Sequence, residues 1–558
     1  MRSLLVAVSA VLAISRSAPI AVTQNGGRVV VANPDSQSVS VVEDAKVAEV
    51  RLGATPQTLA LLGNRAFVTT REGRVFVVDL DAQRVIASAR VGTELFGIAS
   101  DGARLFVSDY GAAAVRVLDA ESLQPIASIA TEEYPRGVTF ADDAVYVTHL
   151  RTGRVSVIDA TTLTVARVLA TEADGNLAQS VTIANGRAYV PQTRANASNP
   201  GLLFDTTVFP VVSAIDLATG TSERFVLDEI DKPVNMPTDA VVTSSGKLYV
   251  VNAGSNDVSV IALAQKKKAA HVAVGANPRG IALSTDERTV YVTNALDGTV
   301  SFIDTATDAV VRTVPVTSIP LAPHVLNGKI LFHSSAIETL AQDKWISCAT
   351  CHFEGGTDGR TWIFRDGPRN TTALYGVLQT LPMHWSGDLD ELQDVESTIR
   401  NVQAGTGLAH GEMNCTPSCD TAPPNRGRSQ DLDDLAAYMT SLEAPHRELP
   451  QNARGAALFA SSGCASCHTA PLYTDRKKHD VGTGTSARER KGSSFDTPSL
   501  RGVFDTAPYL HDGSVATLEE LLATHGNAVL SASERKDLAE FLRSIPFPTT
   551  KRRSATSP

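Results

Sequence analysis

Two copies of one short motif carry the clearest chemistry in this chain of 558 residues. They read Cys348-Ala-Thr-Cys351-His352 and Cys464-Ala-Ser-Cys467-His468. This CxxCH spacing is typical of c-type haem attachment, because two thiols at this distance can add to the two vinyl groups of one haem edge. The adjacent histidine then reaches the iron as an axial ligand. A zinc site would not need a histidine next to each cysteine pair, so we predict two covalently bound c-type haems.

The ligand on the opposite side of each iron decides what a haem can do. An iron with two strong protein ligands transfers electrons, whereas an iron with an open position can bind and activate peroxide or oxygen. The remaining histidines and methionines of this half of the chain are the candidates: His384, His410, His446, His479, His511, His525, Met383, Met413 and Met439. Composition alone does not choose among them.

The elements that precede these motifs are short strands. A pattern of two or three apolar residues followed by small or polar residues recurs seven times, beginning near residues 29, 66, 105, 145, 188, 248 and 290. Further strand-like segments follow each copy, so that every repeat holds four. Short, evenly spaced strands in groups of four predict a β-propeller with seven blades.

The closure of this propeller can also be predicted. Residues 18–25 (APIAVTQN) form a strand-like segment before the first complete repeat, and the seventh repeat, which ends near Ser318, lacks a fourth strand of its own. We therefore expect the amino-terminal strand to complete the last blade and to remove the open sheet edges. Residues 291–294 spell Tyr-Val-Thr-Asn, and residues 18–318 resemble the YVTN family of seven-bladed propellers. The resemblance implies a fold and leaves open which protein ligand the propeller binds.

Strand-like alternation stops near Ile319, where helical segments and long Gly/Pro-containing loops begin. The sequence predicts a multidomain protein, an all-β seven-bladed propeller followed by two mainly α cytochrome c-like domains. The predicted boundaries are 1–17 for a signal peptide, 18–318 for the propeller, 319–448 and 449–547 for the first and second cytochrome c-like domains, and 548–558 for a tail.

The signal peptide is predicted from Arg2 and the apolar run at residues 4–14, which small residues follow. The run is too short to span a bilayer as a helix, and no other stretch approaches eighteen apolar residues. We therefore expect a periplasmic or otherwise exported protein with no membrane span. The net charge of −10 argues against nucleic acid as the main partner, because phosphate binding needs a basic face.

The residues around the two motifs show a second resemblance. The first CxxCH is followed by GGTDG and GPRN within residues 342–376, and the second by LRG and TAPYLHDGSVATLEE within residues 498–520. Over residues 325–546 these motifs resemble the bacterial diheme cytochrome c peroxidases and the related MauG enzymes. The resemblance implies one haem in each of two cytochrome c-like domains. Peroxide is then reduced at the first haem, with electrons that a small redox protein supplies through the second.

The resemblance also implies roles for single residues. His352 is the proximal ligand of the peroxide-reacting haem, and His468 that of the electron-transfer haem. Trp385, in HWSGD, matches the tryptophan between the haems. Glu412, in HGEMN, matches the distal acid/base that moves a proton between the peroxide oxygens, although its distance from Trp385 is longer here than in the family.

The second distal ligand follows the TLEE segment, where the family carries methionine or tyrosine. The matching position here is His525, so we expect two histidines on the second iron, which should lower the potential of that haem. In the peroxidases a histidine after the first motif blocks the first iron until reduction. The corresponding stretch here, TWIFRDGPRN, has none, so the first iron is expected to be open at rest unless His384 or His410 caps it.

Two structural features accompany these roles. The family places a calcium ion between the domains, and the matching positions are Asn370, Thr506 and Pro508, whose oxygen atoms suit that ion. Cys415 and Cys419 remain outside the CxxCH motifs. In an oxidising compartment they are expected to form a local disulfide that holds the loop of Glu412.

Three other interpretations stay open. The first is a MauG-like oxidation of a protein or organic substrate that the propeller presents. The second is an electron-transfer or binding protein in which both irons are blocked. The third is a nitrite-reductase-like arrangement with a further haem in the propeller, for which His149, His271 and His324 are the available ligands.

Overall fold

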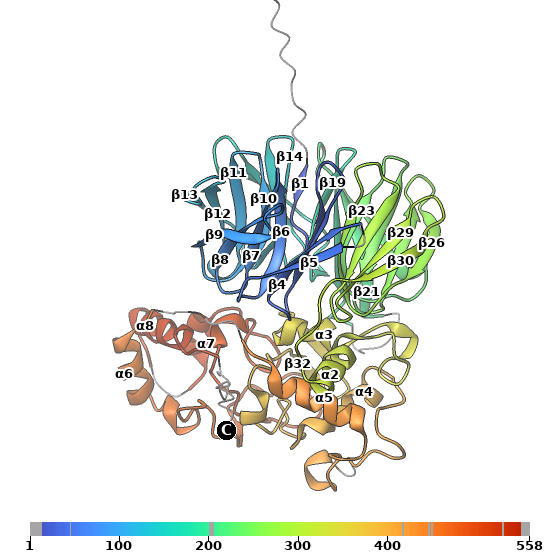
Figure 1. The fold of residues 1–558 in the computed structure, drawn as a ribbon. Coiled ribbons are helices and arrows are strands. Elements are labelled where there is room, and N and C mark those ends of the chain that lie inside the picture. Colours follow the sequence, from blue (N-terminus) through green and yellow to red (C-terminus); the bar gives the residue numbers. More distant parts are fainter. Residues whose placement is uncertain are drawn as a thin grey trace, which may run out of the picture.

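The computed structural model describes residues 14–44, 46–199, 206–415, 418–444, 447, 450–526 and 529–547. Most of the predicted signal peptide, the predicted tail and His446 lie outside these residues. A propeller stands above a mainly helical region in Figure 1, and the two are in contact. The predicted fold class, a seven-bladed all-β propeller followed by a helical cytochrome c-like region, is confirmed.

Seven antiparallel sheets form the blades. The first three comprise β2 (Ile20–Val22), β3 (Val29–Asn33), β4 (Ser38–Glu43) and β5 (Lys46–Arg51); β6 (Pro56–Leu62), β7 (Arg65–Thr70), β8 (Arg74–Asp79) and β9 (Arg84–Arg90); and β10 (Leu95–Ser100), β11 (Arg104–Asp109), β12 (Ala114–Asp119) and β13 (Pro125–Ala130). The fourth and fifth comprise β1 (Ser15–Arg16), β14 (Pro135–Ala141), β15 (Ala144–His149), β16 (Val155–Asp159) and β17 (Thr164–Leu169); and β18 (Gly175–Asn176), β19 (Thr182–Ala184), β20 (Arg187–Ala195), β21 (Val208–Asp216) and β22 (Ser222–Val226). The last two comprise β23 (Pro237–Val242), β24 (Lys247–Asn252), β25 (Asp257–Ala262) and β26 (Lys267–Ala273); and β27 (Pro278–Leu283), β28 (Thr289–Asn294), β29 (Thr299–Asp304) and β30 (Ala309–Pro315).

The recurring apolar pattern forms one equivalent strand in every blade: β3, β7, β11, β15, β20, β24 and β28. These strands are buried on both faces because neighbouring blades pack against each other. In β7, for example, Ala66, Phe67 and Val68 are fully buried, and Phe67 packs against the next blade while Val68 packs against the previous one. The blade-to-blade core therefore explains the pattern that the sequence shows.

The ring does not close as we expected. The strand β2 belongs to the first blade, where Ile20 pairs with Val31, and the seventh blade has four strands of its own. The first and last blades meet through a shared apolar core, in which Ile20 and Val31 pack with Ala282 and Tyr291. The predicted repeats were out of phase by one strand: residues 278–283 (β27), which the sequence counted as the end of the sixth repeat, are the first strand of the seventh blade.

A short segment ahead of β2 occupies the centre of the propeller (Figure 1). The strand β1 pairs with β14, and the backbone N–H of Ser17 donates to the Val138 carbonyl at 2.8 Å. Arg16 reaches a different blade, where its guanidinium forms an ion pair with Asp239. Residues 15–17, which the sequence assigns to the signal peptide, are therefore part of the propeller in this structure.

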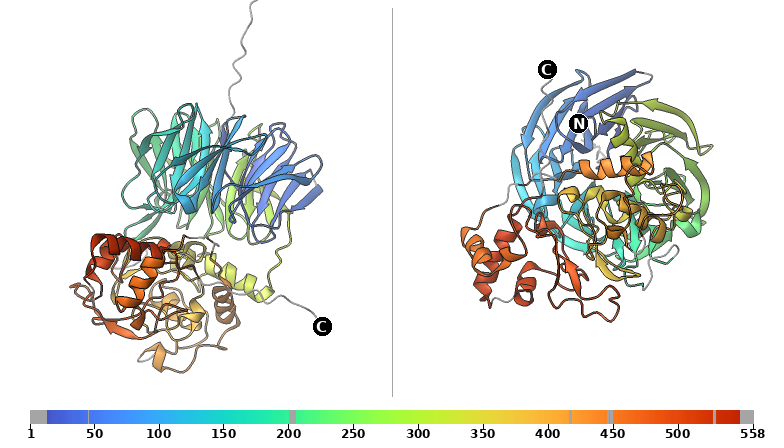
Figure 2. Two further views of the ribbon diagram at one scale, coloured as in Figure 1. Left: turned by 90° about the vertical axis from the view of Figure 1, so that its left-hand side faces the viewer. Right: turned by 90° about the horizontal axis from the view of Figure 1, so that it is seen from below.

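The helical region covers one face of the propeller (Figures 1 and 2). Its helices are α2 (Pro323–His333), α3 (Cys348–Cys351), α4 (Val395–Asn401), α5 (Gln430–Ser441), α6 (Ala453–Ser461), α7 (Leu518–Thr524) and α8 (Ala532–Arg543), while α1 (Leu227–Ile230) lies in the propeller. Two short hairpins join them: β31 (Thr361–Phe364) with β32 (Gly367–Asn370), and β33 (Lys478–Asp480) with β34 (Ser494–Asp496). Short 3₁₀ helices complete the elements: η1 (Tyr110–Ala112), η2 (Gln342–Lys344), η3 (Phe353–Gly355), η4 (Val377–Gln379), η5 (Leu392–Asp394), η6 (Cys419–Thr421), η7 (Cys464–Ser466) and η8 (Val503–Asp505).

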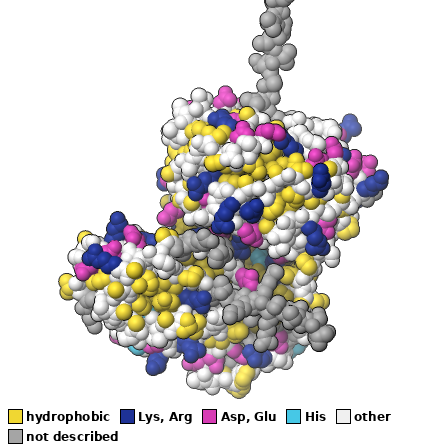
Figure 3. All heavy atoms as spheres, turned by 60° about the vertical axis from the view of Figure 1, so that its left-hand side comes forward, with side chains coloured by type: hydrophobic (Ala, Val, Ile, Leu, Met, Phe, Trp, Pro, Cys, Tyr) yellow, Lys and Arg dark blue, Asp and Glu magenta, His cyan; other side chains and the backbone are white. Residues whose placement is uncertain are grey.

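Amphipathic helices build a core in each half of this region. The helix α5 begins after Ser429, whose hydroxyl caps the Leu432 N–H, and its buried face packs on α2. The helix α8 begins after Ser531 in a capping box with Glu534 and packs on α6 and α7. Hydrophobic side chains also gather on the outer face of the α6–α8 part (Figure 3). Among the described residues, no helix combines the length and the apolar character needed to cross a bilayer.

Candidate functional site

Both CxxCH motifs open into one cavity of about 1980 Å³ in the helical region. All four motif cysteines and both motif histidines line it. Ordinary small-molecule pockets measure roughly 300–1,000 Å³, so this cavity has room for two large cofactors. Its walls near the first motif are largely apolar and include Phe332, Trp362 and Leu374. Such walls exclude water from whatever the cavity holds.

The first motif is held on the short helix α3. Ser347 caps this helix in a capping box with Thr350. The helix is a single turn that begins at Cys348 and ends at Cys351. The Nδ1 atom of His352 lies 2.9 Å from the Thr372 carbonyl oxygen, which leaves Nε2 free to act as a ligand. Burial lowers the pKa of His352 to about 4, so the imidazole is neutral, as iron ligation requires.

The second motif has the same arrangement. The Nδ1 atom of His468 lies 3.2 Å from the Tyr473 carbonyl oxygen, and burial lowers the pKa of the imidazole. The ring of His525, at the end of α7, lies 6.4 Å from the ring of His468, measured between centroids. Two imidazoles that share one metal through bonds of about 2 Å have ring centres about 6 Å apart. The structure thus brings together the histidines that the sequence suggested for the second iron.

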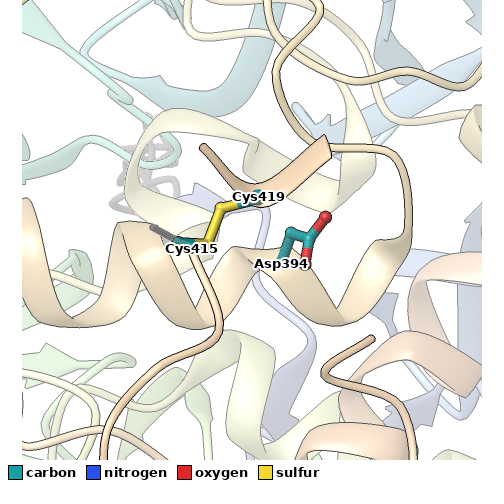
Figure 4. A group of neighbouring side chains, drawn as sticks. All are labelled: Asp394, Cys415 and Cys419. Atoms are coloured by element: carbon teal, nitrogen blue, oxygen red, sulfur yellow. A yellow bond between two sulfur atoms is a disulfide. The ribbon is translucent and has the colours of Figure 1, made fainter. Parts of the chain in front are cut away.

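The six cysteines divide into two groups. The four motif cysteines are free thiols, and burial raises the pKa of Cys348, Cys351 and Cys464. Cys415 and Cys419 form the predicted disulfide, beside Asp394 (Figure 4). Because both of these sulfur atoms are joined to each other, they do not offer a metal the thiolates it would need.

Trp385 lies where the two halves of the helical region meet. Its indole N–H donates to the Asn370 carbonyl of β32 at 2.9 Å, and its own carbonyl accepts from the Asp496 N–H of β34 at 2.8 Å. Its ring centre is 6.4 Å from that of His511. All four residues line the cavity that both motifs share, and a place for Trp385 between two haems stays a prediction.

The structure places Glu412 differently from Trp385. Glu412 is exposed and does not line the cavity, whereas the next residue, Met413, does. The Glu412 carbonyl accepts a hydrogen bond from Arg428, which ties this part of the loop to the surface. The acid/base role of Glu412 therefore stays a prediction, with no contact to the cavity in this structure.

The other candidate ligands also divide into residues that line the cavity and residues that do not. The cavity wall includes His384, His479, His511, Met383, Met413 and Met439. His410 is exposed at a different, shallow pocket. His384 and His479 each pair with a carboxylate, Asp388 at 3.1 Å and Asp475 at 2.8 Å. Either of these two histidines would have to leave its carboxylate partner, or bind through its other nitrogen, to ligate a metal.

The predicted calcium positions are partly brought together. The side-chain amide of Asn370 donates to the Pro508 carbonyl, while its own oxygen, Oδ1, is buried without a hydrogen-bond partner. Thr506 lies in the same loop and its hydroxyl donates to the Val503 carbonyl at 3.1 Å. An unpaired buried oxygen beside a backbone carbonyl fits the donor chemistry of calcium.

Two further residues line the cavity: Gln403, which the sequence did not single out, and His511, which it named only as one of several candidate ligands. Gln403 is buried, donates from Nε2 to Cys348 Sγ at 3.6 Å and has an unpaired Oε1. His511 is 1% exposed, stacks on Phe495 at 3.9 Å and makes no hydrogen bond through either ring nitrogen. His511 stood among nine candidate ligands, but only the fold shows that its ring faces the junction of the two halves.

The propeller histidines have other partners. In His149, which is fully buried, Nδ1 contacts the Glu133 carbonyl at 3.0 Å and Nε2 contacts the Ser156 hydroxyl at 2.8 Å. In His271, Nδ1 lies 2.6 Å from Asp231 and Nε2 lies 3.5 Å from Asp257. His324 is exposed at the start of α2. Ligation of a propeller haem would therefore require His149 or His271 to give up these contacts.

Asp496 is a titratable group of the cavity whose pKa is strongly displaced. Burial, and then the nearby Asp475 carboxylate, raise its pKa to about 7. Because the folded state holds this proton more tightly than the unfolded state, the stability from this group is complete below about pH 4 and is lost as the pH rises through about 7. We expect Asp496→Asn to flatten this fall in urea unfolding of the holoprotein between pH 5 and 8. If the unfolding free energy of the variant falls with pH as it does in the wild type, the raised pKa of Asp496 is contradicted.

Comparisons with known proteins agree with this architecture. A YNCE-like beta-propeller model matches residues 234–327, and a cytochrome D1 heme domain model matches residues 29–139. A RoxA-like, cytochrome c-like model matches residues 494–528, the segment that includes Asp496, His511 and His525.

Individual relatives match about two fifths of the chain. The methylamine utilization protein MauG of Methylorubrum extorquens is 27% identical over 40% of this chain and 79% of its own length. The cytochrome c551 peroxidase of Nitrosomonas europaea is 25% identical over 39% of this chain and 78% of its own length. Hydrazine synthase of Kuenenia stuttgartiensis aligns with 52% of this chain and 97% of its own, at 21% identity and a TM-score of 0.49, and we draw nothing from this likeness.

Fold, site and relatives together define the class: an oxidoreductase with haem cofactors, built on cytochrome c-like domains. Within this class the chain is cytochrome c peroxidase-like and MauG-like, and it carries a YNCE-like seven-bladed propeller at its amino-terminal side. The resemblance that the sequence motifs indicated is confirmed.

Proposed function

We propose that this protein is an exported diheme c-type cytochrome that reduces hydrogen peroxide at the haem bound by Cys348, Cys351 and His352. Electrons reach that haem through a second one, bound by Cys464, Cys467 and His468. The observation that carries the proposal is that both motifs line one cavity with Trp385 at the junction between them. The named function of the relatives, cytochrome c peroxidase, supports the same reaction.

When bound, a haem with an open position supplies the iron that activates peroxide. The protein chain would hold this haem and shield it from solvent. The thiols of Cys348 and Cys351 form the thioether bonds, and the Thr372 carbonyl orients His352 through Nδ1. Gln403 provides a buried polar side chain beside Cys348, and Glu412 is the proposed acid/base on the neighbouring loop. Glu412 can act only if its loop turns this side chain inward.

The second haem site takes electrons from a small redox protein. His468 and His525 would hold its iron, and an iron with two strong protein ligands suits electron transfer. Trp385, with Asn370 and His511 around it, spans the contact between the two halves. An aromatic ring in van der Waals reach of both halves is a short route for electrons.

The ligand set of the second iron can be tested directly. We expect His525→Met to raise the potential of one haem, because a thioether favours the reduced iron more than an imidazole does. Redox titration followed by visible spectroscopy measures the shift. The matched control is His479→Met, which replaces another cavity histidine of the same half and should shift neither potential. Equal effects of both variants would remove His525 from the ligand set.

A MauG-like oxidation of a protein or organic substrate is the second candidate. The match to the methylamine utilization protein supports it, as does the absence of a histidine in TWIFRDGPRN, which leaves the first iron without its expected block. In that case the propeller would bind the protein substrate. A protein in which His384 or a methionine blocks the first iron would instead only transfer electrons.

Calcium and location complete the proposal. Asn370 Oδ1 and the carbonyls of Thr506 and Pro508 are the proposed calcium ligands, and the buried Asn370 Oδ1, which has no hydrogen-bond partner, supports this proposal.

Export to the periplasm or beyond is supported by the disulfide between Cys415 and Cys419 and by the apolar run near the amino terminus. We propose no nucleic-acid partner, because the net charge is −10.

The deciding experiment is low-temperature EPR of the ferric holoprotein, with iron and haem counted on the same sample. We expect two haems per chain, one high-spin and one low-spin, together with peroxide turnover by a reduced small cytochrome. Two low-spin signals that persist after one-electron reduction would overturn the peroxidase proposal and leave electron transfer. Oxidation of a bound protein without turnover of the cytochrome would favour the MauG-like alternative.

A further inference from the structure

The propeller holds the first CxxCH motif from its amino-terminal side. The side chain of Asn235, in the loop before β23, is 1% exposed and lies against α3. Its Nδ2 donates to the Trp345 carbonyl at 3.0 Å. Its Oδ1 accepts from the hydroxyls of Ser347 at 3.3 Å and Thr350 at 3.2 Å. Because Thr350 stands between the two motif cysteines, a propeller side chain directly contacts the haem-binding turn.

The propeller also holds the residues that follow the motif. Glu354 comes two positions after His352, and its carboxylate receives Arg279 at 3.0 Å and Arg136 at 3.3 Å. Arg136 comes from β14 and Arg279 from β27, so the two arginines belong to different blades. Their guanidinium carbons also lie 5.1 and 5.3 Å from the ring centre of Phe353, in cation–π contact.

A continuous apolar core joins the two parts at this place. Leu150, Leu177 and Met236 of the propeller pack in one cluster with Phe353 and Ala349 of the first haem-binding segment. Phe353 is 5% exposed. The segment around His352 therefore packs against the propeller as well as against its own domain.

The charges at this contact are unequal. Two arginines, Arg136 and Arg279, converge on the single carboxylate of Glu354, and Arg136 keeps Nε buried without a hydrogen-bond partner. A third, Arg71, reaches Tyr375, whose hydroxyl donates to the Glu354 carbonyl at 3.0 Å, but Arg71 has its own carboxylate, Glu94, at 4.0 Å and does not add to the excess. Positive charge near an iron stabilises its reduced form, which carries one positive charge less. The propeller thus places an excess of positive charge close to His352.

We propose that the propeller is the positioning and electrostatic support of the first haem, acting through Asn235, Arg136 and Arg279 on residues 345–354. The inference rests on the proposed diheme function and adds a role for the propeller in it. These propeller residues are positioning residues, because they touch the protein segment that carries the haem. The positive charges of the two arginines keep the reduction potential of the first haem higher than it would be beside the negative charge of Glu354 alone.

Two substitutions that change the local charge in opposite directions test the inference in the holoprotein. Glu354→Gln removes the negative charge and should raise the potential of the first haem, and Arg279→Gln removes a positive charge and should lower it. Each change is expected to alter the reduction equilibrium on the order of tenfold, with an effective dielectric constant of about 20 near the surface. The measurement is a redox titration with EPR and visible spectra, which resolves the two haems. The second haem should not shift.

Matched variants separate charge from packing. Arg279→Lys keeps the charge and should leave the first potential near that of the wild type. Lys329→Gln breaks another ion pair between the propeller and the helical region, with Asp35 at 2.5 Å, and should shift neither haem. If Arg279→Gln does not fold, Glu354→Gln decides alone: an upward shift supports the inference, and no shift or a downward shift overturns it.

The outcomes also distinguish this inference from the proposed function. Fewer than two haems in the wild-type protein would overturn the proposed function itself. Two haems, with the first potential unchanged in both charge variants or shifted in the same direction by both, would overturn only the role of the propeller.

Discussion

Replacing Cys348 and Cys351 together by alanine is expected to remove one covalent haem and to abolish peroxide turnover. Both thiols line the cavity as free thiols, and the other two free cysteines, Cys464 and Cys467, belong to the second motif. Loss of the reacting iron should lower turnover about a thousandfold or more, since rate enhancements of enzymes begin far above this value. Haem-stained denaturing gels, the pyridine haemochrome spectrum and the turnover number measure the result.

The second motif provides the reciprocal variant. Cys464 and Cys467 changed together to alanine should also leave one haem, but the remaining haem should still respond to added peroxide in its spectrum, while turnover with the donor protein is lost. The control changes Cys415 and Cys419, which are joined in a disulfide, and should keep both haems. Peroxide reactivity that disappears with the second motif and survives loss of the first would show that the two roles are reversed.

The features that the sequence predicted depend on residues that are close together along the chain. A CxxCH motif needs five consecutive residues, and the disulfide joins cysteines only four positions apart. The propeller repeats its strand pattern in every blade, because each strand meets the same blade-to-blade core. His525 could be placed because its distance from the TLEE segment along one helix, α7, is fixed.

The features that the sequence did not predict depend on distant residues or on exposure. Glu354 and Arg279 are 75 positions apart, and no pattern along the chain connects them. The division of the strands into blades was also wrong by one strand, because the strand pattern repeats along the chain without marking where one blade ends and the next begins. Glu412 was assigned by its motif, but whether a loop residue faces a cavity depends on how the loop folds, and in this structure its neighbour Met413 faces inward.

Arg16→Ala is expected to destabilise the propeller strongly. Asp239 is 1% exposed, and Arg16 is the charged partner of its carboxylate, with Nη2 at 3.2 Å. The backbone N–H groups of Ala240 and Ile281 donate to the same carboxylate at 2.9 and 3.0 Å, so it would keep hydrogen bonds without a counter-charge. A buried carboxylate that loses its partner costs about 3 kcal/mol of unfolding free energy. Calorimetry of the propeller transition measures the loss.

A second propeller ion pair provides the control. Arg28 pairs with Asp81 at 2.6 Å, but the Asp81 side chain is 62% exposed, so solvent screens this pair and Arg28→Ala should cost far less than Arg16→Ala. Equal effects of the two variants would contradict a special role of Arg16. The double variant Arg16→Ala with Asp239→Ala should recover part of the loss, because it removes both buried charges.

The same ion pair bears on how the chain is processed. The two partners are 223 positions apart, so the ion pair exists only when the amino-terminal segment and the sixth blade are both in place. Cleavage after residue 17, at the predicted end of the signal peptide, would remove Arg16 and leave Asp239 unpaired. We therefore expect the exported protein to begin at or before Ser15, and amino-terminal sequencing decides the point. A mature chain that starts at Ala18 and unfolds at the same temperature as one that starts at Ser15 would show that the ring needs no central strand.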